Sequence, residues 1–282
     1  MNYLSTFAMD ETAGRGSSGD SFEPDKVGEI PGMNASTSPE RLLVILEMFE
    51  RERRPLSLKE LAEYCQIPVS TCHTLVHVLL KRAYLYQVGQ RKNLYPTRKL
   101  YDMGATIMAH DEVLLRLRPV METLRDATRE TIILGKRQKE SIVYLEVLES
   151  PEVIRYSAQP GDTKPLHSTC IGKALLSTLE PADIRKLLET HPPTQITPNT
   201  ITSYAQLMND LQQGRAMGYF TTRGENVADV TALAVPISVN NEFFGLAVAG
   251  PSHRINARFN TFADALRAAV DTLREQGVAD HG

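Results

Sequence analysis

Apolar residues between positions 57 and 82 recur at the spacing expected for two short amphipathic helices joined by a turn. In both helices they follow the i, i+3, i+4, i+7 pattern of one buried face. The turn covers residues 66–69, and Ser70 or Thr71 can cap the second helix. The pattern therefore predicts a helix-turn-helix. The apolar faces consist of Leu58, Leu61, Ala62 and Cys65 in the first helix, and of Cys72, Leu75, Val76 and Leu79 in the second.

The other face of the second predicted helix is polar, with many hydrogen-bonding groups and few carboxylates. When a helix-turn-helix binds DNA, its second helix lies in the major groove and its side chains contact base edges. A solvated outer face on an ordinary helical hairpin is the alternative interpretation. The side chains predicted to contact DNA are Ser70, Thr71, His73, Thr74, His77 and Lys81.

The residues after this helix pair predict two short strands around a basic turn, which together form a wing. Residues 83–88 are rich in β-prone side chains, and residues 89–93 form a turn before the chain leads back. Arg91 and Lys92 lie at the tip, where they can contact DNA phosphates. The charge distribution agrees, because residues 38–108 contain eleven Lys or Arg and seven Asp or Glu in a chain of net charge −3.

Composition and pattern divide the 282 residues into four parts. Residues 1–37 are rich in Gly, Ser, Asp and Glu without any period, which favours a disordered tail. Residues 38–97 form the predicted winged helix, which opens with a helix at 39–50. Residues 98–130 predict one long helix or a helix pair with a wide apolar face. This connector is suited to pairing two subunits, to packing against the next domain, or to both.

Residues 131–282 alternate predicted strands with helices. Strands outnumber helical crossovers, which favours an antiparallel sheet with flanking helices. Residues 240–242 predict a short hairpin turn. The predicted fold class is therefore α+β. The expected strands are 131–134, 141–148, 153–158, 232–239 and 243–249, and the expected helices are 171–178, 181–190, 203–215 and 257–276.

Composition also bears on where the protein works. A transmembrane helix needs a run of about 18 apolar residues, and the sequence contains none. The N-terminus has neither the charged start nor the apolar core of a signal peptide. Three cysteines without the spacing of a disulfide framework favour a reducing compartment. We therefore expect a cytoplasmic protein with no membrane contact and no cofactor.

Four motifs in the C-terminal half carry a family resemblance. They are Pro165–Leu176 after Gly161, Gly218-Tyr219 followed by Glu225, Ala234-Val235-Pro236, and Ala249-Gly250-Pro251 followed by Arg254. Together with the predicted winged helix and connector, they resemble the signature of IclR-type bacterial transcriptional regulators over about residues 38–276. The resemblance implies a GAF-like domain that binds a small-molecule effector and alters binding to a double-stranded DNA operator. It also implies a homodimer or a dimer of dimers.

The effector site implied by this resemblance lies where residues 166–172 run into a helix start. Free N–H groups and the helix dipole suit a carboxylate there, and the known effectors of the family are mostly organic acids. Leu233, Val235, Ala247 and Ala249 are expected to project into the pocket from a hairpin, with core packing as the alternative. The predicted effector-binding residues are Tyr156, His167, Ser168, Thr169, Cys170, Ile171, Glu225, Asp229, Leu233, Val235, Ala247 and Ala249.

The sequence departs from the family pattern at several positions. Some members carry Ser where this chain has Ala247 and Ala249. Two alanines predict a roomier, less polar pocket, which favours a larger acid such as an aromatic carboxylate over glyoxylate or pyruvate. Asp229 replaces the usual Gly and can attract a hydroxyl, an amine or a cation. Thr74 replaces the usual Arg, so a bidentate contact to guanine cannot form there and a different operator is expected.

Two residue clusters suggest other chemistry. Cys72, His73 and His77 have no second pair at zinc spacing, so no metal site is expected. Cys170 near His167 suggests an acyl hydrolase or an oxidant sensor, but no orienting group is apparent and a small pocket residue is the simpler interpretation. We expect no catalytic residues and favour a ligand-responsive regulator of a catabolic operon. A small-molecule-binding module that signals through a protein partner is the alternative.

Overall fold

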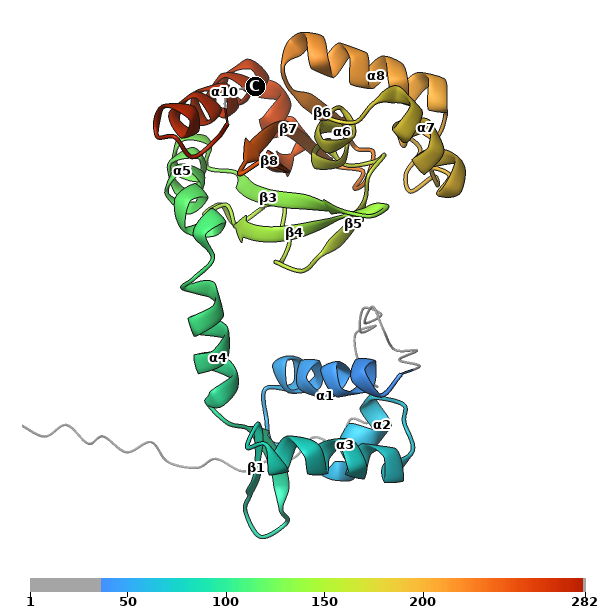
Figure 1. Cartoon of the computed structure of the whole chain (residues 1–282), viewed down its shortest axis with the longest axis vertical. Coiled ribbons are helices and arrows are strands. Elements are labelled where there is room, and N and C mark those ends of the chain that lie inside the picture. The colour runs from blue at the N-terminus through green and yellow to red at the C-terminus, as the bar shows by residue number, and fades with distance from the viewer. Residues whose placement is uncertain (1–36, 281–282) are drawn as a thin grey trace, which may run out of the picture. The chain divides into compact units, whose positions relative to one another are not determined.

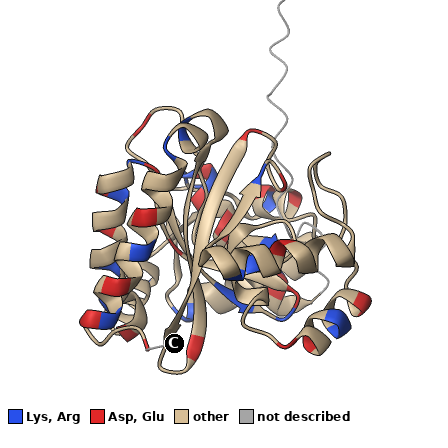
Figure 2. Ribbon diagram, turned by 90° about the horizontal axis from the view of Figure 1, so that it is seen from above, with Lys and Arg blue, Asp and Glu red and all other residues tan. Residues whose placement is uncertain are grey.

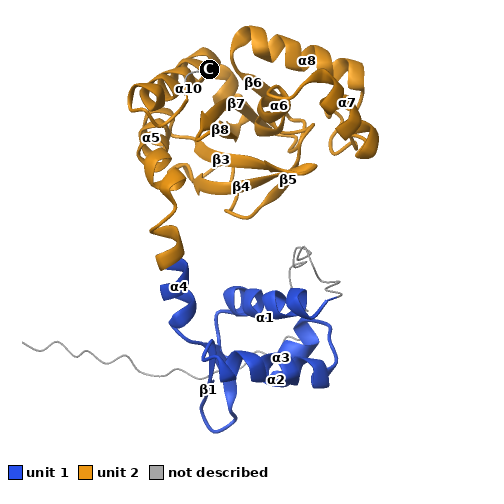
Figure 3. Ribbon diagram, viewed as in Figure 1, with its two compact units in different colours: residues 1–105 blue, residues 106–282 orange. Residues whose placement is uncertain are grey.

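The computed structural model describes residues 37–280, so the predicted tail lies outside the described residues except for Thr37. The chain forms two compact units, and the boundary between them along the chain lies between Ala105 and Thr106 (Figure 3). Within the described residues, no helix has the length and apolar character needed to cross a membrane.

The first unit is a winged helix, as predicted (Figure 1). The antiparallel hairpin of β1 and β2 is the wing, and it turns at Gly89 and Lys92, which both have positive φ. Leu85 and Leu94 are buried and attach the hairpin to the helical core. The elements are α1 (Ser38–Glu52), α2 (Leu58–Tyr64), α3 (Val69–Lys81), β1 (Leu85–Val88), β2 (Asn93–Pro96) and α4 (Lys99–Met108), the last of which runs across the boundary between the units.

Local capping sets where these helices begin. Thr37 and Glu40 form a capping box at α1, and Ser57 and Glu60 form another at α2. Helix α3 has no side-chain cap, because it begins at Val69 directly after Pro68. The prediction that Ser70 or Thr71 caps α3 is therefore wrong, and both residues lie within its first turn. Proline before the first helical residue already fixes the entry of the chain without a capping hydroxyl.

The second unit contains a six-stranded antiparallel sheet in the order β5-β4-β3-β8-β7-β6, which confirms the α+β fold class. Its strands are β3 (Thr131–Gln138), β4 (Ser141–Leu148), β5 (Thr163–Pro165), β6 (Phe220–Arg223), β7 (Val230–Val239) and β8 (Glu242–Pro251). Its helices are α5 (Glu112–Thr128), α6 (Cys170–Leu176), α7 (Pro181–Thr190), α8 (Tyr204–Met217), α9 (Ser252–Ala257) and α10 (Phe259–Glu275).

Helices cover both faces of this sheet (Figure 1). Helices α5 and α10 bury Leu117, Met121 and Leu266 against one face, while α6 packs on the other. The outward surfaces of α5 and α10 carry interspersed acidic and basic residues, as a solvated face does (Figure 2). Within the predicted connector 98–130, α5 is thus part of the second unit, whereas α4 buries none of its residues.

Three predicted elements differ in the structure. Residues 153–158 form no strand, because Val153 and Ile154 are exposed in a loop that follows Pro151. The predicted helix 257–276 is two helices, α9 and α10, separated at Arg258. The short strands β5 and β6 went unpredicted, since three or four residues carry too little alternation to recognise.

Candidate functional site

Helix α3 presents a polar outer surface to solvent. Ser70, His73, Thr74, His77 and Lys81 are exposed, and Thr71 is half-buried. The first turn of α3 contains no acidic residue. The hydroxyl of Thr74 donates to the Ser70 carbonyl at 3.1 Å, so within this surface its proton is already used by the helix itself.

The wing carries two exposed cations. Arg91 and Lys92 lie in the turn between β1 and β2 and are exposed. In the part of the chain that the structure describes, neither residue forms an ion pair. Both charges are therefore free to meet an anion.

The second unit encloses a cavity of about 30 Å³ between the sheet and the start of α6. Six of the predicted effector residues line it, and they come from the loop before β5, from α6 with its cap, and from β8. The lining residues are Ile133, Tyr144, Tyr156, Thr169, Cys170, Ile171, Thr222, Asn226, Val227, Val230, Ala232, Ala247 and Ala249.

The prediction that Leu233 and Val235 project into this cavity is wrong. In β7, Ala232 lies directly opposite Ala249 of β8, and directly opposed residues of an antiparallel pair share a face. Leu233 and Val235 therefore point to the other face, where they join the core beneath α10. The expected register was off by one residue, which exchanges the two faces of a strand.

Three further predicted residues lie near the cavity without lining it. The buried His167 ring places Nε2 2.9 Å from the Thr194 carbonyl, and burial lowers the pKa of His167. The Ser168 hydroxyl donates to Asn226 Oδ1 at 3.4 Å. Asp229 is exposed, so its side chain faces solvent instead of a ligand.

Thr169 lines the cavity, and its side chain caps the start of α6. Its Oγ1 accepts from the Gly172 N–H at 3.1 Å and donates to the Pro165 carbonyl at 2.9 Å. Thr169, predicted to bind the effector, is therefore not free to donate its hydroxyl proton, which already has an acceptor in the protein.

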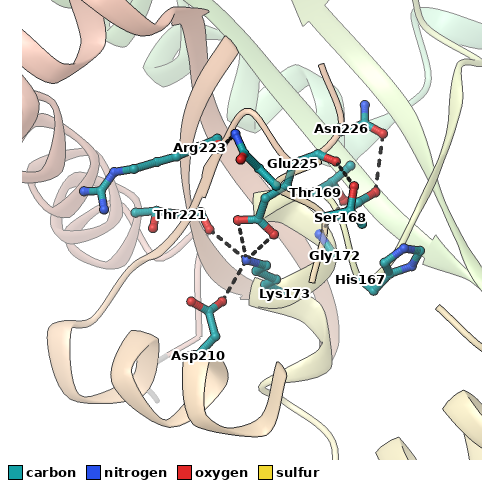
Figure 4. A network of polar contacts seen from close by, with 12 residues as sticks. His167, Ser168, Thr169, Gly172, Lys173, Asp210, Thr221, Arg223, Glu225 and Asn226 are labelled. Atoms are coloured by element: carbon teal, nitrogen blue, oxygen red, sulfur yellow. Dashed lines mark hydrogen bonds and ion pairs between the residues drawn. The ribbon is translucent and has the colours of Figure 1, made fainter. Parts of the chain in front are cut away.

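A buried ion cluster lies beside the cavity (Figure 4). Lys173 Nζ lies 2.8 Å from each carboxylate oxygen of Glu225, 2.8 Å from Asp210 Oδ2 and 3.1 Å from the Thr221 carbonyl. Glu225, predicted to bind the effector, thus directs its carboxylate to Lys173 and does not line the cavity. Burial raises the pKa of Glu225, and the ammonium of Lys173 partly offsets that rise.

Lys173 was not predicted, although the sequence held a signal for it. It is the one charged residue of the otherwise apolar α6, whose seven residues are all buried. A lysine within a fully buried helix requires an acidic partner.

Cys170 has the properties of a buried packing residue. Burial raises the pKa of its thiol to about 12, so the thiol stays protonated near neutral pH. Nucleophilic cysteines show the opposite shift. His167 meets the Thr194 carbonyl, so the geometry gives no support to a Cys170–His167 pair. Among the described residues, no three His, Cys, Asp or Glu side chains gather as metal ligands would.

Comparison with known proteins connects both units to one family. The family model of the IclR helix-turn-helix domain matches residues 38–89, and that of the bacterial transcriptional regulator IclR C-terminal matches residues 105–275. The HTH-type transcriptional regulator BhcR of Paracoccus denitrificans is 30% identical over 221 residues, which cover 77% of this chain and 79% of that protein.

Solved structures show the same fold. The crystal structure of the Thermotoga maritima IclR matches with a TM-score of 0.72 at 22% identity, covering 86% of this chain and 98% of that one. An IclR homologue from Microbacterium hydrocarbonoxydans, complexed with 4-hydroxybenzoate, matches with a TM-score of 0.67 at 22% identity, covering 83% and 96%.

Fold, sites and relatives together define a transcriptional regulator with a DNA-binding domain and an effector-binding domain. The chain belongs to the IclR family of bacterial transcriptional regulators.

The start of α6 gives a test of how closely this site is packed. A Cβ on Gly172 would lie 2.0 Å from the Leu166 backbone oxygen, whereas a Cβ on Gly104 in α4 meets nothing within 4 Å. We predict that Gly172→Ala destabilises the second unit by about 2 kcal/mol or more. Gly104→Ala, the matched control, is expected to be neutral or to stabilise by up to about 1 kcal/mol. Thermal unfolding followed by circular dichroism measures both, and equal effects would contradict the packing described.

Proposed function

We propose that the protein controls a catabolic operon in response to a small organic acid bound in the cavity beside α6. The observation that carries this proposal is the position of the cavity, which is lined by Thr169, Cys170 and Ile171 at the first turn of α6. The N–H groups of a first turn have no acceptor within their helix and attract a carboxylate. Asn226 and Thr222 add polar groups to an otherwise largely apolar wall, the composition usual for a small-molecule site.

The size of the cavity limits what it holds in the described conformation. A volume of about 30 Å³ exceeds the ~10–15 Å³ that one water needs, but it does not admit an aromatic ring. The expectation that Ala247 and Ala249 make a roomy pocket is therefore corrected, because both alanines line the cavity and its volume is still small, with the larger side chains of Ile133, Tyr144 and Ile171 in the same wall. An aromatic acid is accommodated only if part of the wall moves.

An aromatic acid nevertheless belongs among the candidates. The homologue from Microbacterium hydrocarbonoxydans forms a complex with 4-hydroxybenzoate. Tyr144 and Tyr156 line the present cavity, and their rings can pack against an aromatic ring of the ligand. Organic acids of several sizes are therefore the class to test, with aromatic carboxylates included.

We further propose that α3 reads the operator with Ser70, Thr71, His73, Thr74, His77 and Lys81. Their exposure on one surface of α3 supports this assignment. The Thr74 hydroxyl donates its proton to the Ser70 carbonyl, so its oxygen remains able to accept a hydrogen bond from a donor group on a base. Arg91 and Lys92 on the wing supply phosphate contacts, which add affinity without sequence preference.

The same account includes a homodimer, or a dimer of dimers, in which two reading heads meet a near-palindromic operator. Helix α4 supports this proposal, since Tyr101, Met103, Ile107 and Met108 are apolar side chains exposed on it. We place the connector at α4 alone, because α5 packs on the sheet of the second unit.

The wing assignment predicts a change in salt dependence. Replacing Arg91 and Lys92 with Ala should weaken binding to specific and unrelated DNA alike. It should also lower the slope of log affinity against log salt by up to about 1.8, or about 0.9 for each lost phosphate contact. Fluorescence anisotropy with a duplex from upstream of the gene and an unrelated duplex measures this slope. Arg137→Ala with Lys139→Ala, which removes two cations from the second unit, is the matched control and should leave it unchanged. An unchanged slope in the wing variant would remove the wing from the DNA interface.

The effector assignment predicts a thermal shift with one class of acid. A ligand at about 100 times its dissociation constant adds about 2.7 kcal/mol of stability, or about 5 °C or more for a domain of this size. Ala247→Val adds two methyl groups to the cavity wall and should abolish the shift. Ala268→Val, on the exposed surface of α10, should keep it. Aliphatic, dicarboxylic and aromatic acids, 4-hydroxybenzoate among them, form the screen. The absence of any shift would refute acid sensing and leave the DNA-binding assignment intact.

A further inference from the structure

One segment that borders the cavity is the loop 224–229, between β6 and β7. Asn226 and Val227 of this loop line the cavity, as does Val230 directly after it. The middle of the loop is exposed from Val227 to Asp229. Any ligand larger than the present cavity of about 30 Å³ requires part of this wall to move.

The loop is held at its first residues by a buried charge. Lys173 is fully buried, and all four of its oxygen contacts lie within 3.1 Å. Removing a charge from water is costly unless partners compensate it. Glu225 is itself buried, so each member of this pair is held in place by its need for the other.

The opposite side of the loop is held by two threonines. Thr200 Oγ1 donates to the Glu225 carbonyl at 2.6 Å, and Thr197 Oγ1 donates to the Gly224 carbonyl at 2.6 Å. Beyond Glu225, the Asn226 side chain accepts only a long hydrogen bond of 3.4 Å from Ser168, whereas the backbone carbonyls of Val227 and Asp229 accept from the Val230 and Ser252 N–H groups at 3.1 and 2.8 Å. The loop is therefore fixed at its start through Glu225 and at its end through Asp229, and the Asn226 side chain, which touches the cavity, is held weakly between them.

We propose that Lys173 and Glu225 are positioning residues that hold the loop 224–229 over the cavity and so set which ligands can enter it. The pair contacts no ligand itself and acts through Asn226 and Val227. Lys173 lies one turn after Cys170 on α6, so the same helix forms the cavity wall and anchors the loop that covers it. The proposal rests on the effector site proposed above for the identity of the ligand class, but the closure of the loop can be tested without a ligand.

Cys170 offers a reporter of this closure. It is buried and lines the cavity, so a bulky thiol reagent needs a wider opening of the wall to reach it than a small reagent does. Because Glu225 influences the thiol pKa of Cys170, a single reaction rate would mix chemical reactivity with access. The ratio of the rates for N-phenylmaleimide and N-methylmaleimide removes the thiolate fraction, since both reagents react with the same thiolate and differ in size.

The test uses the full chain at one fixed pH, with alkylation of the Cys170 peptide followed by mass spectrometry. Glu225→Gln keeps the size of the side chain and removes the charge that holds the loop, while Lys173 retains Asp210 and the Thr221 carbonyl. We expect the bulky-to-small ratio to rise about tenfold over the unsubstituted protein, because loss of one partner of a buried pair strongly weakens what it holds. An unchanged ratio would overturn the proposal.

Glu130→Gln is the matched control. Glu130 is equally buried and is held by Arg254 Nε and Nη2 at 2.7 and 2.8 Å, but it has no contact with the loop. Its ratio should stay within about twofold of the unsubstituted protein, because the substitution leaves the Lys173–Glu225 pair in place. An equal rise in this variant would show loss of stability instead of loop opening, and would also overturn the proposal. Alkylation of Cys65 and Cys72 in the same samples reports opening of the first unit, where both are buried.

A second variant keeps the proposal open to refutation if Glu225→Gln does not fold. Thr200→Val removes the hydroxyl that donates to the Glu225 carbonyl from the other side. It should raise the ratio about threefold, in the direction expected for a neutral hydrogen bond, and no rise would count against the proposal. The alkylation experiments are carried out without any organic acid. A negative result in them therefore contradicts the role of the loop and not the acid sensing that the thermal-shift screen tests.

Discussion

The close approach of α6 to the sheet is the constraint on which the effector-binding unit depends. The sheet face beneath α6 carries small side chains, namely Ala232, Ala234, Ala247 and Ala249. Gly245 continues this surface, and a Cβ there would lie 2.7 Å from Ile171 Cγ2. A larger residue on this face would either fill the cavity or displace α6 from the sheet. The alanines therefore allow α6 to pack closely on the sheet, and the space that remains between them is a cavity of about 30 Å³.

The close packing of α6 on the sheet also determines which charges are buried in this unit. A helix buried on all sides has no solvent-facing position for a charged side chain, so Lys173 must find its partners inside the protein. It finds Glu225 from the loop after β6 and Asp210 from α8, and it thereby joins three segments that are far apart in the chain. Packing of small residues and pairing of buried charges are thus two consequences of one geometric arrangement.

Much of this could be predicted from the sequence where the signal was local. The helix pair 57–82 and the wing follow from apolar spacing and turn residues, and both were confirmed. The wall of the cavity could not be predicted in full, because strand register depends on partners distant in the chain. One residue of slip placed Leu233 and Val235 on the wrong face. The fate of Glu225 was equally non-local, since its partner Lys173 lies 52 residues away, whereas the Thr169 hydroxyl is used locally, by Pro165 and Gly172.

The central claim is that occupancy of the cavity and binding of DNA are linked, and such linkage must be reciprocal. The most direct test takes the acid with the largest thermal shift and measures the DNA affinity of the full chain with and without it, then the acid affinity with and without DNA. The account predicts the same factor in both directions, about fivefold or more, and no effect on DNA binding in Ala247→Val. Identical DNA affinity at saturating acid would contradict it.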